Sequence, residues 1–132
     1  MAVDTFDPAS LTNRITPEVI NSLVNAVSHV HESGFGLAPE VLAAMPGIAK
    51  HGPVDWAEAV KSLPDDEICS LITVFTLGER DLSGWEAGAK SPVIPMAREL
   101  KRRGVFDAKL VTWIKSNSNN RFLPHGSLMD RL

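Results

Sequence analysis

The sequence contains one cysteine and no tyrosine among its 132 residues. A single Cys69 cannot close a disulfide within the chain, and it lacks the CxxC partner that a thiolate zinc site requires. A chain of this length buries roughly two thirds of its unfolded surface, so one hydrophobic core suffices without a disulfide or a metal. We therefore expect a fold held by apolar packing in a reducing compartment.

Long hydrophobic runs are also missing. No stretch approaches the ~18 apolar residues of a membrane-spanning helix, so we predict that a membrane is not a partner. The first ten residues, MAVDTFDPAS, contain neither the basic region nor the apolar run of a secretory signal. These features favour a cytoplasmic protein.

The sequence has none of the glycine-rich phosphate loops GxGxxG or GxxxxGK[ST], and no GxSxG nucleophile turn. The acidic run 65–67 is explained by the positive dipole end of the helix that it begins. Cys69 falls at the edge of a predicted apolar face, where it is interpreted as a packing residue. We therefore predict no catalytic residues and no cofactor, and an enzyme is the least favoured class.

Histidine, a common metal ligand, occurs at positions 29, 31, 51 and 125. Helical residues two apart point in nearly opposite directions, so His29 and His31 cannot share an ion. His29 and Glu32 can share a face, but the helical wheel places both on the solvent side. We predict no metal site.

What the sequence does contain is apolar residues at three- and four-residue steps, the pattern of helices that bury one face. The first such segment, 17–33, has Thr16 as a candidate N-cap, Pro17 at its first position and Gly34 as a stop. Glycine and proline leave room for only a short helix at 39–45.

Four more helices follow from the same signals. They begin at Asp55 in a capping box with Glu58, at Pro64, at Ser91 or Pro95, and at Asp107. Gly78 is expected to weaken or end the second of these, and Gly104 to end the third. The segments predict an all-α fold, a compact irregular bundle of five or six helices in a single domain over residues 1–132. We expect residues 1–7 to be flexible and residues 121–132 to dock as a C-terminal tail.

Charge is distributed unevenly along the chain. The net charge is −3, but residues 98–132 hold 8 of the 13 lysines and arginines and only 3 of the 16 acidic residues. The segment RELKRRG supplies Arg98, Lys101, Arg102 and Arg103, of which the first three share a helical face. Two interpretations stay open: a solvated basic helix end, neutralised within the fold, or a site for an external anion.

Two other segments allow a structural and a functional interpretation. Trp85, in a loop between two glycines, is either a plug over the core or an exposed anchor for a partner. The stretch SNSNNRFLPHG is either a hinge with an anchored tail, or a turn in which Arg121 and His125 help the basic cluster to hold a carboxylate or phosphate group.

We identify no characterised family in these residues. The stretch GWEAGAKSPVIPMARELKRRG is similar in character to small bacterial helical proteins, and this likeness implies no activity and no site. The first functional hypothesis is a non-enzymatic interaction or regulatory protein that binds a protein partner or a second copy of itself. The alternative is nucleic-acid or other polyanion binding through residues 98–121, although the net negative charge disfavours a dedicated nucleic-acid binder. A deep pocket that collects Glu86, Arg121 and His125 would favour an enzyme.

Overall fold

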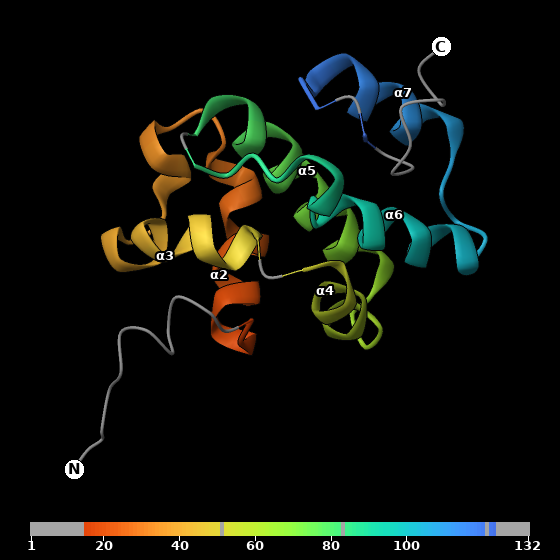
Figure 1. Ribbon diagram of the computed structural model, residues 1–132, viewed down its shortest axis with the longest axis horizontal. Coiled ribbons are helices and arrows are strands. Elements are labelled where there is room, and N and C mark those ends of the chain that lie inside the picture. The colour runs from red at the N-terminus through yellow and green to blue at the C-terminus, as the bar shows by residue number, and fades with distance from the viewer. Residues whose placement is uncertain (1–14, 51, 83, 121, 124–132) are drawn as a thin grey trace.

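The structure is a computed structural model that describes residues 15–50, 52–82, 84–120 and 122–123. Within these residues it contains six α-helices, three short 3-10 helices and no strand (Figure 1). The predicted all-α bundle of five or six helices is therefore confirmed. None of the helices described is both long and apolar enough to cross a membrane.

The elements have the following bounds. The α-helices are α2 (Pro17–Ala26), α3 (Pro39–Ala49), α4 (Pro53–Val60), α5 (Asp65–Asp81), α6 (Val93–Arg102) and α7 (Ala108–Asn117). The 3-10 helices are η1 (Val27–His29), η2 (Ser33–Gly36) and η3 (Gly88–Lys90).

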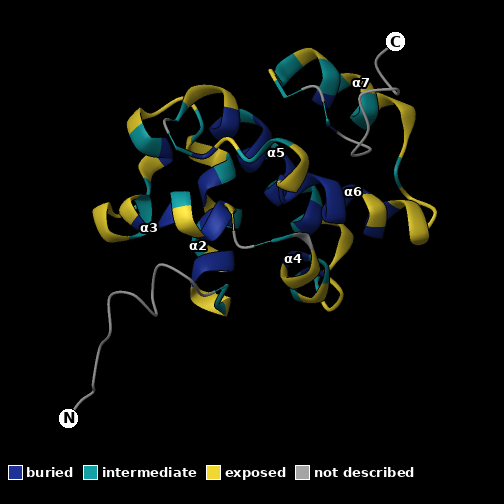
Figure 2. Cartoon of the chain, viewed as in Figure 1, coloured by how far each residue is buried: buried dark blue, intermediate teal, exposed yellow. Residues whose placement is uncertain are grey.

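The central helix is α5, which packs against α2, α6 and α7, while α6 also packs against α4. The buried residues of α5 form one broad face, roughly half of the helix circumference: Ile68, Leu71, Ile72, Val74, Phe75, Thr76, Gly78 and Glu79. So wide a buried face is stable only when several neighbours cover it. Figure 2 shows the buried residues concentrated along α5 and the first half of α6. Helices α2, α6 and α7 therefore cover α5, and α4 packs mainly against α6.

Aromatic rings join four parts of the chain inside this core. Trp85, from the loop after α5, contacts Phe75 and Phe35 at centroid distances of 5.7 and 6.0 Å. Phe75 in turn meets Trp56 of α4 edge-on at 5.1 Å. The Trp56 indole N–H donates a hydrogen bond to the backbone carbonyl of Ile48, at 3.1 Å. The rings thus tie η2, α3, α4 and the loop to α5.

Phe35 adopts a left-handed backbone conformation, with φ of 57°, between Gly34 and Gly36, which are left-handed too. This conformation costs a non-glycine residue about 1–2 kcal/mol. The Phe35 side chain is 3% exposed and packs against Trp85. Burial of a phenylalanine side chain recovers a similar amount, which explains how the turn is maintained.

Two predicted caps are confirmed and a third is wrong. Thr16 Oγ1 accepts a hydrogen bond from the Val19 N–H at 3.1 Å, and Asp107 Oδ1 accepts one from the Leu110 N–H at 2.8 Å. Asp55 does not cap α4, because that helix begins two residues earlier and places Asp55 in its first turn. Proline at the first helical position is preset for a helix, which accounts for the earlier start.

The predicted ends of three helices also need correction. The α-helix that begins at Pro17 ends at Ala26 and continues only as the 3-10 turn η1, well short of residue 33. Helix α3 continues past Pro46 to Ala49, because Ile48 and Ala49 are fully buried. Helix α5 continues through Gly78 to Asp81. In α3 and α5 tertiary packing, rather than local propensity, determines how far the helix continues.

Gly78 has a packing role instead of a helix-ending one. A Cβ atom at this position would lie 2.2 Å from Cε3 and 2.5 Å from Cζ3 of Trp85. The indole therefore lies directly on the bare backbone of α5, and Trp85 is 1% exposed. The interpretation of Trp85 as a core plug is the correct one, and this side chain is not available as an exposed anchor for a partner.

Other predictions fall partly outside the residues described. Residues 1–7, predicted to be flexible, belong to this category, as do Arg121 and residues 124–132 of the predicted tail. Of the two tail residues described, Leu123 is 1% exposed and Phe122 packs partly buried against the core.

We predict that Gly78→Ala lowers the free energy of unfolding by about 1–3 kcal/mol, because overpacking at Trp85 outweighs the higher helix propensity of alanine. Urea unfolding followed by circular dichroism measures this change. Gly47→Ala, an exposed position in α3, is the matched control and should be neutral or stabilising. A stabilised Gly78→Ala protein would contradict the packing described here.

Candidate functional site

The four residues of the predicted basic cluster have different roles. Arg103 points into the structure, where its side chain is 18% exposed. Its guanidinium donates to the backbone carbonyls of Val60, Lys61 and Leu63 at 3.3, 3.0 and 2.8 Å. These carbonyls lie at the C-terminal end of α4 and just beyond it. Arg103 therefore supplies donors to backbone carbonyls at the end of α4, where the helix leaves acceptors without helical partners, and it is a structural residue.

Two carboxylates hold the same guanidinium in place. Asp65, at the start of α5, accepts a hydrogen bond from Arg103 Nη1 at 2.7 Å, and Glu99 of α6 accepts one from Nε at 2.7 Å. Arg103 thus connects the end of α4, the start of α5 and the end of α6. A lysine could not make this set of contacts, because its ammonium lacks the planar fork of donors.

Glu99 is buried and also holds Arg102. The Arg102 Nε and Nη2 atoms donate to the two Glu99 oxygens at 3.1 and 2.5 Å. Hydrogen bonds from Arg102, and then from Arg103, lower the pKa of Glu99 from 4.5 to about 2 against the opposing effect of burial. Arg102 nevertheless remains 67% exposed, so it presents charge to solvent while one edge of its guanidinium is fixed.

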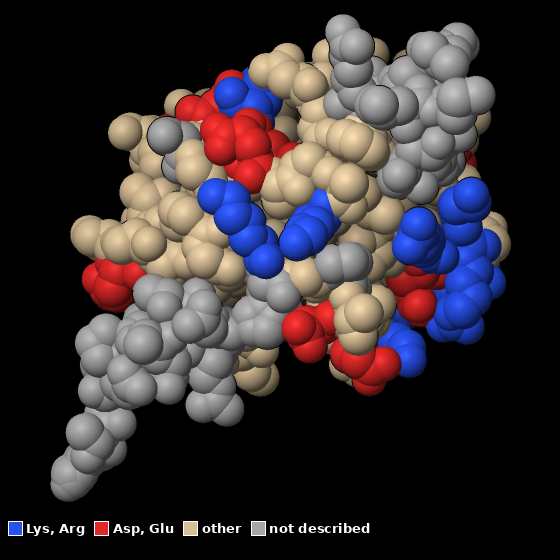
Figure 3. All heavy atoms as spheres, in the orientation of Figure 1, with Lys and Arg blue, Asp and Glu red and all other residues tan. Residues whose placement is uncertain are grey.

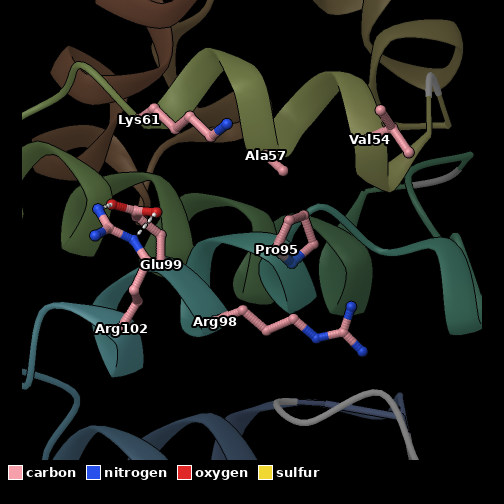
Figure 4. Close-up of a pocket in the computed structure, with 7 residues that line it drawn as sticks. All are labelled: Val54, Ala57, Lys61, Pro95, Arg98, Glu99 and Arg102. Carbon is pink, nitrogen blue, oxygen red and sulfur yellow. Dashed lines mark hydrogen bonds and ion pairs between the residues drawn. The ribbon is translucent and has the colours of Figure 1, made fainter.

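A groove of about 340 Å³ lies between α4 and α6, beside this network (Figure 4). Ala57 and Val54 of α4 and Pro95 of α6 supply apolar surface to it. Val54 is 76% exposed, so most of its side chain is available for contact. The volume is at the lower end of the range of ligand-binding clefts.

Cationic side chains border this apolar surface. Lys61 at the C-cap of α4 and Arg98 and Arg102 of α6 line the groove, and among the residues described Glu99 is its one acidic lining residue. Figure 4 shows Arg98 extended along α6, away from the Arg102–Glu99 pair. Figure 3 shows lysine and arginine gathered at the edge of the molecule where α6 ends. The groove therefore combines aliphatic contact area with positive charge on more than one side.

Sequence reasoning found Arg98 and Arg102 but missed the other half of the groove. Val54 and Ala57 of α4 and Lys61 at its C-cap meet α6 only in the folded chain. Lys61 also forms an exposed ion pair with Glu58 at 2.7 Å, a contact that any helix surface can offer. An exposed valine near a helix start was the one available signal, and it is too common to be diagnostic.

The remaining predicted site residues are not brought together within the part of the chain described. Lys101 is exposed on α6 but is not among the residues that line the groove. Trp85 is in the core, and Glu86 beside it is exposed. The predicted roles of Arg121 and His125 lie outside the described residues.

The described part of the SNSNN stretch makes internal contacts. The Asn120 amide donates to Glu79 Oε1 at 3.0 Å and to the Gly88 carbonyl at 2.9 Å. The Ser91 hydroxyl donates to the other oxygen of Glu79 and accepts from the Val93 N–H at 3.2 Å. This buried cluster joins α5, the loop that carries Trp85, the start of α6 and the segment after α7.

Glu79 is a buried acid whose protonation is linked to folding. Burial raises its pKa above 4.5, and the negative charge of Glu86 adds to that rise. Hydrogen bonds from Ser91, Asn120 and the Ala87 backbone act in the opposite direction without cancelling it. The folded state therefore binds a proton at Glu79 more readily than the unfolded chain does.

The histidine and cysteine candidates have simple environments. His29 Nδ1 and Glu32 Oε2 are 2.5 Å apart and both side chains are exposed, as the helical wheel predicted. His29 also borders a smaller cavity of about 210 Å³ between α2 and residues 35–38. Cys69 is partly buried. Burial, followed by the charge of Asp65, raises the pKa of its thiol, which disfavours a nucleophilic thiolate.

Among the described residues, no three His, Cys, Asp or Glu side chains come together as metal ligands.

No protein-family model, curated protein or solved structure matches this chain.

We predict that Arg103→Lys lowers the thermal unfolding midpoint by several degrees, because α4, α5 and α6 lose most of the hydrogen bonds that the guanidinium makes between them. Arg98→Lys is the matched control, since Arg98 is an exposed side chain on the same helix. Differential scanning calorimetry of both variants provides the comparison. Equal midpoints for the two would show that Arg103 does not hold these helices together.

We predict opposite pH effects from the two buried glutamates. The pKa of Glu79 is raised, so its contribution to stability is lost as the pH rises above about 4.5 and through its folded-state pKa. The pKa of Glu99 is lowered, so its contribution is lost as the pH falls from 4.5 towards about 2. Urea unfolding across this pH range gives the free energy of unfolding as a function of pH. Glu79→Gln should reduce the pH dependence of this free energy only above about pH 4.5.

In the same measurement Glu99→Gln should reduce the pH dependence of the unfolding free energy only between about pH 4.5 and about pH 2. Glu40→Gln, at an exposed position of α3, is the control and should leave the pH dependence of the unfolding free energy unchanged in both ranges. If neither Glu79→Gln nor Glu99→Gln changes the pH dependence of stability, these two glutamates are not its source.

Proposed function

We propose that this protein is a non-enzymatic interaction protein that binds a protein partner through the groove between α4 and α6. The observation that carries the proposal is the composition of the groove: aliphatic surface with cations on its border. Burial of an exposed valine such as Val54 contributes about 1.5 kcal/mol to a complex, and arginine is enriched at the energetic centres of interfaces.

The arrangement of the buried acids supports a non-enzymatic role. Glu99 is occupied by Arg102 and Arg103, and Glu79 by Ser91 and Asn120. These contacts tie helices to one another, so both carboxylates have a structural use. A cytoplasmic location is part of the proposal and suits the single free thiol of Cys69.

Polyanion binding through residues 98–121 is the second candidate. The observation that favours it is the exposure of Arg98 and Lys101 on α6 and of Lys109 in the first turn of α7. Binding through phosphate contacts would weaken steeply with salt and would depend on Lys109. An interaction confined to the groove would not depend on Lys109, which is not among the groove-lining residues.

We predict that a random-peptide library displayed on phage, panned against the full chain, yields peptides that bind the groove. Ala57→Arg places a long side chain in the groove and should weaken binding of these peptides at least tenfold. Ala43→Arg, the same change at an exposed position of α3, should leave binding intact. Calorimetry with synthetic copies of the enriched peptides measures both affinities.

Thermal unfolding of the two variants checks that each is folded. Enriched peptides that bind the wild-type chain and Ala57→Arg equally would refute the groove as the interaction site. A selection that enriches no binding peptide would count against the proposal as well.

A further inference from the structure

We infer that the partner presents an apolar side chain flanked by carboxylates, that is, an acidic segment with an apolar anchor. This inference rests on the proposed function and specifies the chemistry of the partner. It follows from three features of the groove: where its cations lie, how Arg102 is held, and what kind of apolar surface lies between them.

The cations lie apart from one another. Arg102 is held beside Glu99 near the end of α6, whereas Arg98 extends along the helix in the other direction (Figure 4). Lys61, at the C-cap of α4, lines the groove from the other helix and is also paired with Glu58 at 2.7 Å. A ligand that fills the apolar surface between these side chains therefore has positive charge on either side of it. Carboxylates on both sides of an apolar group complement this layout.

Arg102 is prepared to receive such a carboxylate. Its Nε and Nη2 edge is engaged by Glu99, which leaves the Nη1 donors out of that pair. The Glu99 side chain is only 8% exposed, and it is also bonded to Arg103. An incoming anion therefore meets an oriented guanidinium more directly than it meets the Glu99 charge. Orientation before binding reduces the entropy that complex formation would otherwise cost.

The apolar surface favours a protein segment over a nucleic acid. Val54, Ala57 and Pro95 are aliphatic, and the groove lining contains no aromatic residue among those described. Single-stranded nucleic acids are bound largely by stacking of bases on aromatic side chains, which this surface does not offer. An aliphatic side chain of a protein fits it better.

The test uses defined peptides and two-dimensional ¹H–¹⁵N spectra of the full chain. The probe is a nine-residue peptide with a central leucine flanked by two glutamates on each side. Matched peptides replace the glutamates by lysines, or the leucine by glycine. The acidic leucine peptide should shift backbone amides of α4 and α6, and each replacement should weaken its binding at least fivefold.

A variant of the protein with a reversed charge in the groove should show the opposite peptide preference. Arg98→Glu should weaken the acidic peptide at least tenfold and strengthen the lysine peptide relative to wild type. Lys109→Glu, outside the groove lining, should change neither affinity. Equal binding of acidic and lysine peptides to the wild-type chain would overturn the inference.

The outcomes separate this inference from the proposed function. If groove-directed peptides from the phage selection lack flanking acids and the acidic probe does not bind, the inference fails while the proposed function stands. If an oligonucleotide shifts the same amides more strongly than the acidic peptide, a nucleic acid is the ligand and both fail. A concentration-dependent dimer that Ala57→Arg converts to monomer would identify a second copy as the occupant and overturn the inference.

Discussion

The contact between the Trp85 indole and the bare backbone of Gly78 determines the arrangement of the second half of the molecule. Because the ring lies directly on α5, the loop after α5 must fold back across that helix. This places Ser91 against Glu79 and starts α6 at Val93. Helix α6 then runs alongside both α5 and α4. The close approach in the core thus helps to place α6, which forms one wall of the groove.

The basic run at the end of α6 shows that charged neighbours in sequence need not share a role. Arg103 turns inward and satisfies carbonyls of another helix, whereas Arg102 remains mostly exposed although it binds the same Glu99. Arg98, one turn earlier, borders the groove. A count of positive charges would treat these side chains as one patch. Their hydrogen bonds divide them into a structural group and a surface group.

Much of the fold was predictable from the sequence, because it depends on local signals. Apolar spacing gave the helices, and side-chain caps at Thr16 and Asp107 fixed two of their starts. The errors arose where distant residues decide: Gly78 ends no helix because Trp85 covers it, and α3 passes Pro46 because its last turn is buried. The α4 side of the groove was missed for the same reason, because no pattern in the sequence of α4 indicates which helix packs beside it.

The position of Arg103 also limits how far α4 and α6 can move relative to each other. Its guanidinium fastens the carboxyl end of one groove wall to the other wall and to α5. The walls cannot separate there unless several hydrogen bonds break together. Opening and closing motions of the groove are therefore restrained at this end, where a binding segment would have to adapt its own shape to the walls.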